Sequence, residues 1–518
     1  MIISLSVLVI TIIVSGTYAL YKAQLSKNIG VNTTTHGLAY YINYVKGTDI
    51  TAATLNPSTS YEGGASSNIE FWKKDDSYDI YGKIELTVNT IGTNLKNSPA
   101  IKYAVVNNGN VLKEGSLKGT TSGSKVTILK NLYLEQTKQI YTVYVWLDKS
   151  EELGDISNES LSISVDCTAS LQKEPTAAET IISLYTNASK TTAKNNSITY
   201  NYANIYDTDS DDNTSGGLMN DRLGGTTTDL DGGNIRYYGA SPNNYIYFNC
   251  SDYSNQTSST CETWRIIGVF DGKLKIMRGS QIGGYSWDNK NTSTGAETNN
   301  GKNDWTTARL MKLLNPSNYY TIDSNDNNLG QSLYYNSASG KCYSGQNNAT
   351  VDCDFTSTGI KNEETRNMIA ETTYNLGGWT DYEIYPNEIY GYERGTTVYT
   401  DRPTTWTGKI ALAYPSDYGY AADLNQCKQT LYDYDNSTCT SNNWMKAIIG
   451  TSSYEGWLLT PDSSSSDSVW YVYDGGYVGL YSASIASGAV PVLYLSSELG
   501  IEAGAGDGSS SNPYKLSA

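Results

Sequence analysis

The residues best suited to bind another molecule lie in one short stretch near the C-terminal end of the chain. Four tyrosines alternate there with apolar residues, and they are Tyr471, Tyr473, Tyr477 and Tyr481. Alternation of this kind is typical of half-buried strands. Tyrosine beside serine, glycine and aspartate is also typical of antibody-like binding sites, because the ring is rigid and amphipathic.

The turn between the two strands fixes which residues share a face. A three-residue loop, Asp474 to Gly476, pairs Val472 with Val478 and Trp470 with Leu480, whereas a two-residue turn would mix the faces. One face is then apolar core, and the other carries the tyrosines. We expect the tyrosine face to bind ligand, with the following residues in contact: Tyr471, Tyr473, Asp474, Tyr477, Tyr481, Ser482, Ser484 and Asp467. The alternative is that these rings pack under long loops, as tyrosine does elsewhere in this chain.

The seven cysteines favour an oxidising compartment. Six form local couples in polar loops, namely Cys250 with Cys261, Cys342 with Cys353 and Cys427 with Cys439. No CxxC spacing occurs and the chain has one histidine, so disulfides fit better than zinc. Closing each loop contributes about 3 kcal/mol in the chain-entropy model. Cys167 is left over, and we expect it to be a buried free thiol.

Catalytic chemistry finds little support in the sequence. A serine or cysteine nucleophile would need His36, which lies beside the N-terminal apolar segment. Paired carboxylates, drawn from Asp417, Asp423 or Glu455, are the one open route, as in glycosidases. We therefore expect no catalytic residues, no metal and no cofactor.

Composition and the N-terminus indicate an exported protein. The formal charge of −17 disfavours nucleic acid or anionic membrane as a partner. An apolar run over 1–14, followed by Thr17-Tyr18-Ala19, resembles a signal peptide over residues 1–19. The basic residues of a typical signal are missing, so retention as a membrane anchor stays open. Either way we expect a secreted or cell-surface location, with no membrane contact beyond this segment.

Residues 20–172 read as an all-β domain. Apolar alternation recurs over 38–45, 78–88, 101–106, 126–132, 140–147 and 161–167, with turns such as Asn107-Asn108-Gly109 between. This spacing suggests a β-sandwich. Three stretches, the 16–19 junction, the YTVYVWLD strand at 141–148 and the segment 163–172, resemble the TasA/camelysin family of Gram-positive exported matrix proteins, which implies the surface of a Gram-positive-type bacterium as the location. That resemblance implies an Ig-like or jelly-roll-like sandwich able to assemble into fibres.

Residues 173–217 read as a connector with one short helix. Thr176 to Tyr185 predicts the helix, with Ala178, Ile181, Ile182 and Tyr185 on one side. The polar stretch that follows predicts a flexible linker. The residues from Asp207 to Asp211 match the first positions of an EF-hand calcium loop. The sixth and twelfth positions of that loop do not carry the residues that calcium binding needs, so a solvated acidic linker is the alternative.

Residues 218–497 read as one large α+β domain, followed by a tail at 498–518. We expect strands at 235–238, 245–249, 263–270 and 274–278, the last two joined by Asp271-Gly272. Helices are expected over 303–314, 361–375 and 443–449. The tryptophans 264, 305, 444, 457 and 470 are expected in the core.

Several stretches of this domain resemble a family of uncharacterised surface proteins from gut Firmicutes. They are 235–249, WRIIGVF at 264–270, YPSDYGYA at 414–421, GWLLTP at 456–461 and PVLYLSS at 491–497. The resemblance implies a C-type-lectin-like fold, shared with formylglycine-generating enzymes, and such folds host binding more often than catalysis. Relatives commonly close with Gly-Val-Arg-Pro, whereas Gly488-Ala489-Val490-Pro491 has no arginine.

Three functions remain, from different classes. The first is an adhesin-like or receptor-like display protein whose C-terminal domain binds an extracellular protein or glycan. The second is a matrix or fibre subunit that self-assembles through the N-terminal sandwich. The third is a secreted carbohydrate-active enzyme.

Overall fold

The structure is a computed structural model in which the chain forms two compact units, Met1–Glu174 with Ala518 and Pro175–Ser517. It is mainly β, with antiparallel pairing throughout most sheets. The residues that it describes are 23–25, 38–52, 55–151, 153–156, 159–205, 215–223, 233–288, 300–321, 330–343, 351–451, 455–502 and 504–517. The candidate signal segment 1–19, His36 and the acidic stretch 207–211 lie outside these residues.

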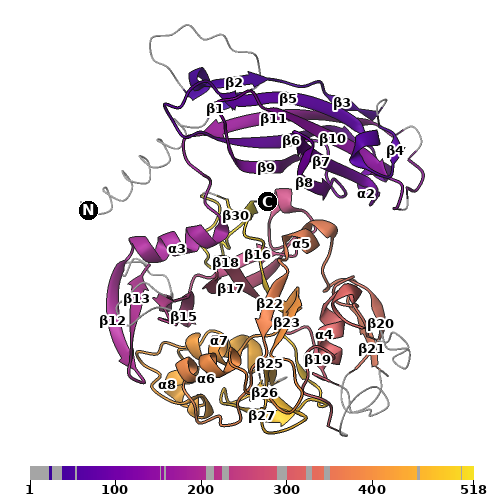
Figure 1. The fold of residues 1–518 in the computed structure, drawn as a ribbon. Helices are drawn as coiled ribbons and strands as arrows, with labels where there is room; N and C mark the ends of the chain where they lie inside the picture. Colours follow the sequence, from indigo (N-terminus) through magenta and orange to yellow (C-terminus); the bar gives the residue numbers. More distant parts are fainter. Residues whose placement is uncertain are drawn as a thin grey trace. The chain divides into compact units, whose positions relative to one another are not determined.

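The first unit is a two-sheet sandwich, drawn in indigo and purple in Figure 1. One sheet contains β1 (Ala23–Leu25), β3 (Ile50–Thr51), β6 (Tyr81–Ile91), β9 (Lys125–Tyr133) and β11 (Leu161–Ser170). The other contains β2 (Ile42–Val45), β4 (Pro57–Ser58), β5 (Ala65–Lys73), β7 (Ile101–Asn107), β8 (Asn110–Ser116) and β10 (Ile140–Asp148). Buried and more exposed residues alternate along β5 and β6, so that one face of each sheet fills a shared core.

The sandwich confirms most of the strands expected from alternation. The Asn108-Gly109 turn between β7 and β8 has the two positive φ angles, 49° and 78°, that a type I′ turn requires. Two longer strands, β5 and β8, and three short ones, β1, β3 and β4, were not expected, and Leu38–Tyr41 forms a 3₁₀ turn, η1, before β2 begins. A short helix, α2 (Thr93–Asn97), and a second 3₁₀ turn, η3 (Tyr61–Gly63), complete this unit. Cys167 lies in β11 as a fully buried free thiol, as predicted.

The second unit is built on a nine-stranded antiparallel sheet. Its strands follow the order β12 (Ser189–Asn195), β13 (Ile198–Asn204), β14 (Ser215–Asn220), β15 (Ile235–Ser241), β17 (Glu262–Phe270), β18 (Lys273–Arg278), β29 (Val492–Tyr494) and β24 (Ile410–Ala411), with β16 (Tyr245–Phe248) paired to β17. Asp271 and Gly272 form the tight turn between β17 and β18 with φ angles of 47° and 71°, as predicted. All five tryptophans expected in the core are buried.

A second sheet of this unit carries the tyrosine hairpin at one edge. Its order is β19 (Gly284–Tyr285), β28 (Ser487–Gly488), β25 (Gly456–Pro461), β26 (Ser468–Val472) and β27 (Val478–Ser482), so β27 is the edge strand (Figure 1). Three two-stranded sheets pair β20 (Ser339–Cys342) with β21 (Val351–Asp354), β22 (Thr372–Asn375) with β23 (Thr405–Gly408), and β30 (Gly500–Ile501) with β31 (Leu516–Ser517).

The expected linker over 173–217 is wrong for its described residues. The predicted helix is present as α3 (Ala177–Asn187) and begins at a Thr176–Glu179 capping box, but Ile182 is exposed and does not share the buried side of Ala178, Ile181 and Tyr185. The polar stretch after it forms β12 and β13 of the large sheet. The tail at 498–518 is also part of the fold, because Tyr247 donates its N–H to the carbonyl of Tyr514.

The helices of this unit are shorter than expected. The 303–314 helix begins only at Arg309 (α4, Arg309–Leu314), because the Asn303 amide is committed to the carbonyls of Asp462, Ser465 and Ser468. The 361–375 helix ends at Met368 (α5, Glu363–Met368), and β22 follows it. The third is α9 (Lys446–Ile449), and α6 (Pro386–Glu393), α7 (Pro415–Tyr420) and α8 (Ser437–Thr440) were not expected.

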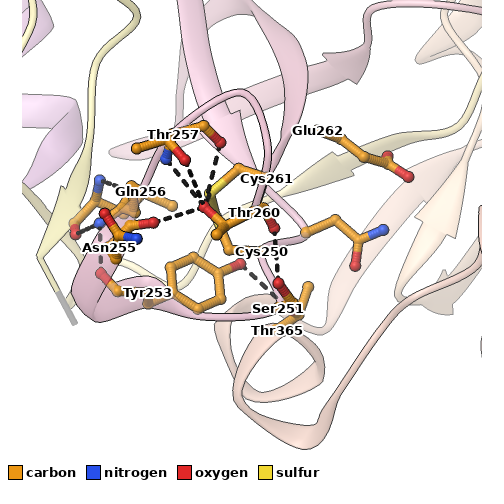
Figure 2. The surroundings of a disulfide bond; sticks show 12 residues. Cys250, Ser251, Tyr253, Asn255, Gln256, Thr257, Thr260, Cys261, Glu262 and Thr365 are labelled. Carbon is orange, nitrogen blue, oxygen red and sulfur yellow. Dashed lines mark hydrogen bonds between the residues drawn. A yellow bond between two sulfur atoms is a disulfide. The ribbon is translucent and has the colours of Figure 1, made fainter. Parts of the chain in front are cut away.

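All three predicted disulfides are present, Cys250–Cys261, Cys342–Cys353 and Cys427–Cys439. Figure 2 shows the first, enclosed by a polar loop in which the Thr260 hydroxyl donates to the carbonyl of Asn255 at 2.5 Å. The hydroxyls of Tyr253 and Thr365 lie 3.1 Å apart beneath it, which ties the loop to α5. Each of the three bonds therefore closes a local loop.

Candidate ligand-binding surface

The hairpin has the register that the sequence predicted. Val472 pairs with Val478 and Trp470 with Leu480. The N–H of Tyr473 donates to the carbonyl of Tyr477 at 3.0 Å, which closes a three-residue loop over Asp474–Gly476. Gly476 has a φ of 100°, a conformation that residues with a side chain rarely adopt.

The apolar face is core, with one exception. Trp470, Val472 and Val478 are fully buried, and the Trp470 indole N–H donates to the carbonyl of Trp379 at 3.0 Å. Leu480 was expected to be buried with them but is only half-buried, because it lies on the edge strand β27. The hairpin is thus held from beneath by its apolar side chains.

The opposite face does not expose all four tyrosines, and Tyr471 is a correction to the expected site. Its exposed fraction is 1%, because β26 lies between β25 and β27 and neighbouring rings cover it. The Trp457 ring lies 5.2 Å from it on one side and the Tyr481 ring 5.6 Å on the other. Tyr471 therefore supports the surface from below and is unavailable to a ligand.

The other three hairpin tyrosines reach solvent. Tyr481 is 42% exposed, and Tyr473 and Tyr477 are half-buried. The rings of Tyr473 and Tyr477 stack with centroids 4.2 Å apart and planes 8° apart. Because the two rings lie face to face across the closing pair of the turn, they form a rigid aromatic unit.

Two further tyrosines extend this array from other segments. Tyr432, in the 3₁₀ turn η8 (Leu431–Asp433), is 42% exposed, and its ring centroid lies 6.0 Å from that of Tyr477. The half-buried Tyr382 ring lies 4.9 Å from Tyr432. We call Tyr382, Tyr432, Tyr473, Tyr477 and Tyr481 the tyrosine surface. Sequence reasoning missed the first two, and the only signal was that Tyr432 lies inside the Cys427–Cys439 loop.

The polar residues of the expected site also divide into accessible and buried positions. Asp474 is exposed at the turn and Ser482 is half-buried on β27. Ser484 is only 2% exposed, and its N–H and C=O bond to the carbonyl of Asn300 and the hydroxyl of Ser286, so it is removed from the site. Asp467 is half-buried beyond the end of the hairpin away from the turn, where its carboxylate accepts from the Ser465 hydroxyl at 2.6 Å.

The turn is anchored to a buried helix. The Tyr418 hydroxyl, on α7, donates to the carbonyl of Gly476 at 2.7 Å. In the same helix Asp417 accepts from Arg236 at 2.9 Å and from Lys275, while Arg236 also pairs with Asp221 at 2.5 Å. All four charged side chains are buried, and the two cations lower the pKa of Asp417 even though burial opposes its ionisation. Asp417 therefore belongs to a buried ion network.

The acidic residues near the tyrosine surface differ from this network. The exposed Asp435 and Asp474 and the half-buried Glu455 all lie within electrostatic range of the Tyr477 hydroxyl. Burial, and then the charge of Asp474, raises the pKa of Glu455. Burial, followed by Tyr477 and Glu455, raises the pKa of Tyr473 to about 12. The Tyr473 phenol is thus neutral at physiological pH, and the carboxylates near it make its surroundings negative.

The exposed rings, hydroxyls and carboxylates of this surface can make apolar contacts and hydrogen bonds to a partner. Over the described ranges, no group of three or more His, Cys, Asp and Glu side chains is placed to hold a metal ion. No helix in the same part of the chain is both long and apolar enough to cross a membrane.

Comparisons with known proteins add little to this picture. No protein-family model matches the chain, and no curated protein is significantly similar to it. One solved structure, titled "Crystal structure of botulinum neurotoxin serotype D binding domain", aligns over 50% of this chain and 85% of its own with 10% identity. Its TM-score of 0.13 is too low to support an inference about fold or function.

Proposed function

We propose that this chain is an exported cell-surface protein whose second unit binds an extracellular protein or glycan through the tyrosine surface. The observation that carries the proposal is the continuous contact among five tyrosines from three separate segments, each with part of its ring open to solvent. Tyrosine meets a partner with an apolar ring and a hydroxyl together, at a small cost in side-chain entropy.

Rigidity also supports a binding role. The hairpin turn is held by the Tyr418 hydroxyl, and the neighbouring Tyr432 segment is closed by the Cys427–Cys439 disulfide. A surface that is already in its binding conformation loses less entropy when a partner arrives. These features favour a display protein of the adhesin or receptor-like class.

Export and the lectin-like fold class are part of the same proposal. Three disulfides support an oxidising, extracellular location. The C-type-lectin-like assignment of residues 218–497 is supported by the sequence resemblance, and the exposed tyrosine hairpin suits a fold used for binding.

An array experiment tests the proposal. The full chain and its Tyr477→Ser/Tyr481→Ser variant are applied to glycan and extracellular-protein arrays. We expect at least one ligand that the wild type binds and the double variant loses. Tyr78→Ser is the matched control, because Tyr78 is 44% exposed in the first unit and should leave every signal unchanged. Wild-type binding that survives in the double variant would reject the tyrosine surface as the site.

A second candidate function, assembly into fibres, is favoured by one observation in the first unit. The edge strand β8 pairs only with β7 among the described strands, and it exposes Val111 and Leu112, each at 43%. An open edge with apolar side chains can pair with a strand of another copy. Electron microscopy of the purified chain tests this, since fibres that disappear in Val111→Lys/Leu112→Lys would support it and dispersed particles of the wild type would not.

A further inference from the structure

The carboxylates around the tyrosine surface are positioned together near the hairpin turn. Asp474 is the first residue of the three-residue loop, and a methyl group on Gly475 would lie 3.6 Å from Cβ of Asp435. Glu455 directly precedes β25, and the charge of Asp474 acts on its carboxyl group. The charges of these three carboxylates, which come from three segments, all act on the hydroxyl of Tyr477.

Among the described residues, these carboxylates have no ion-pair partner. In the part of the chain that the structure describes, Asp435, Asp474 and Glu455 form no ion pair, although the stem of Lys446 packs close to Gly476. Elsewhere the same unit pairs its acidic groups closely, as Asp417 with Lys275 and Arg236, and Glu262 with Arg278 at 3.0 Å. Mutual repulsion at the turn is unfavourable in the free protein, and a bound cation would relieve it.

The tyrosine rings of the surface also favour a bound cation. A guanidinium or ammonium ion is attracted to the face of a tyrosine ring. The second unit already uses this contact internally, with the Arg394 guanidinium 3.4 Å from the ring centroid of Tyr390 and that of Arg265 3.7 Å from Tyr245. An arginine can stack on a ring and donate two parallel hydrogen bonds to a carboxylate at once.

We propose that the partner of the tyrosine surface is a basic protein segment, whose arginine or lysine side chain lies against Tyr477 and pairs with Glu455, Asp474 and Asp435. This inference rests on the proposed function and names its ligand class. A neutral glycan would stack on the rings but would not relieve the repulsion among the carboxylates. Nucleic acids and anionic glycans would be repelled by these groups and by the formal charge of −17.

Synthetic peptides provide the probe. The full chain is titrated with an arginine-rich glycine-serine peptide and with the same peptide carrying citrulline, a neutral analogue of arginine. We expect the arginine peptide to bind, the citrulline peptide to bind far more weakly, and the affinity to fall as salt rises. Glu455→Gln/Asp474→Asn should weaken binding of the arginine peptide at least about fivefold.

The control variant matches the change in charge. Asp271→Asn/Asp401→Asn also removes two exposed carboxylates from the second unit and should leave the affinity unchanged. Thermal melts verify folding, and Asp435→Asn alone gives an independent test at a fully exposed position. Equal binding of the arginine and citrulline peptides, no binding of either, or equal loss in both double variants would overturn the inference.

The outcomes separate this inference from the proposed function. A glycan that is lost in Tyr477→Ser/Tyr481→Ser but retained in Glu455→Gln/Asp474→Asn would leave the binding surface standing and reject the basic partner. If neither double variant changes the binding of any array ligand or peptide, both are rejected.

Discussion

At the scale of single residues, the tyrosines of the hairpin fall into two groups. Tyr471 is covered by rings on both sides, whereas Tyr473, Tyr477 and Tyr481 each keep part of the ring in solvent. Alternation along a strand tells which face a residue is on, but it does not tell whether a neighbouring strand covers that face. Tyr471 is buried for this reason, since β25 brings Trp457 against it.

Substitution of an exposed hairpin tyrosine should lower the free energy of unfolding much less than substitution of a core residue beneath it. Tyr481→Ser should cost on the order of 0.5 kcal/mol of unfolding free energy, as for ordinary surface changes. Trp470→Ala should cost about 3 to 5 kcal/mol, because it leaves a large cavity under the sheet. Thermal or denaturant unfolding of both variants measures this. A Tyr481→Ser variant that unfolds as readily as Trp470→Ala would mean that the ring is part of the core.

The acidic residues give the binding a predicted pH dependence. Because burial and Asp474 raise the pKa of Glu455, this group becomes neutral at a higher pH than an ordinary glutamate. As the pH falls, the affinity for the arginine peptide should therefore begin to weaken at a higher pH than an ordinary glutamate would give. Titrations at a series of pH values measure it, and in Glu455→Gln the weakening should move to lower pH. Affinity that rises on acidification would contradict the assignment.

At the scale of elements, the turn and α7 form one unit through a single hydrogen bond. Tyr418→Phe removes the hydroxyl that donates to the carbonyl of Gly476 and leaves the buried ring in place. We expect a loss of about 1 to 2 kcal/mol in stability and faster hydrogen exchange at the amides of the turn. Hydrogen exchange that is faster only far from Asp474–Gly476 would show that α7 does not anchor the turn.

The parts of the fold that could be predicted are those set by local chemistry. The three disulfides, the register of the tyrosine hairpin and the Asp271-Gly272 turn follow from spacing and turn residues. The polar strands β12 and β13 were missed because their stability comes from pairing within a large sheet and not from local alternation. The helix over 303–314 was predicted too long because a distant contact, Asn303 to the 462–468 loop, overrides its capping preference.

The same distinction applies to the candidate site. Tyr473, Asp474, Tyr477 and Tyr481 could be found from sequence because they lie on one hairpin. Tyr382 and Tyr432 could not, since they come from segments about 90 and 45 residues away and only the fold brings them together. The burial of Ser484 likewise depends on its bonds to Ser286 and Asn300.

At the scale of the whole molecule, the charges are distributed in two ways. In the interior of the second unit Asp221, Arg236, Lys275 and Asp417 are paired, whereas the carboxylates near the tyrosine surface form no ion pair among the described residues. Asp417→Asn should therefore destabilise the second unit by about 3 to 5 kcal/mol, because Lys275 and Arg236 stay buried with a charge uncompensated. Denaturant unfolding measures the loss, and a change below about 1 kcal/mol would mean that the network contributes little.

The most direct test of the binding surface is a hydroxyl-radical footprint of the full chain with and without the first ligand that the arrays identify. We predict that bound ligand protects Tyr432, Tyr477 and Tyr481 from oxidation and leaves Tyr78 and Tyr133, which are equally exposed in the first unit, unprotected. Protection of other residues, with Tyr477 and Tyr481 oxidised as in the free chain, would contradict the assignment of the tyrosine surface as the site.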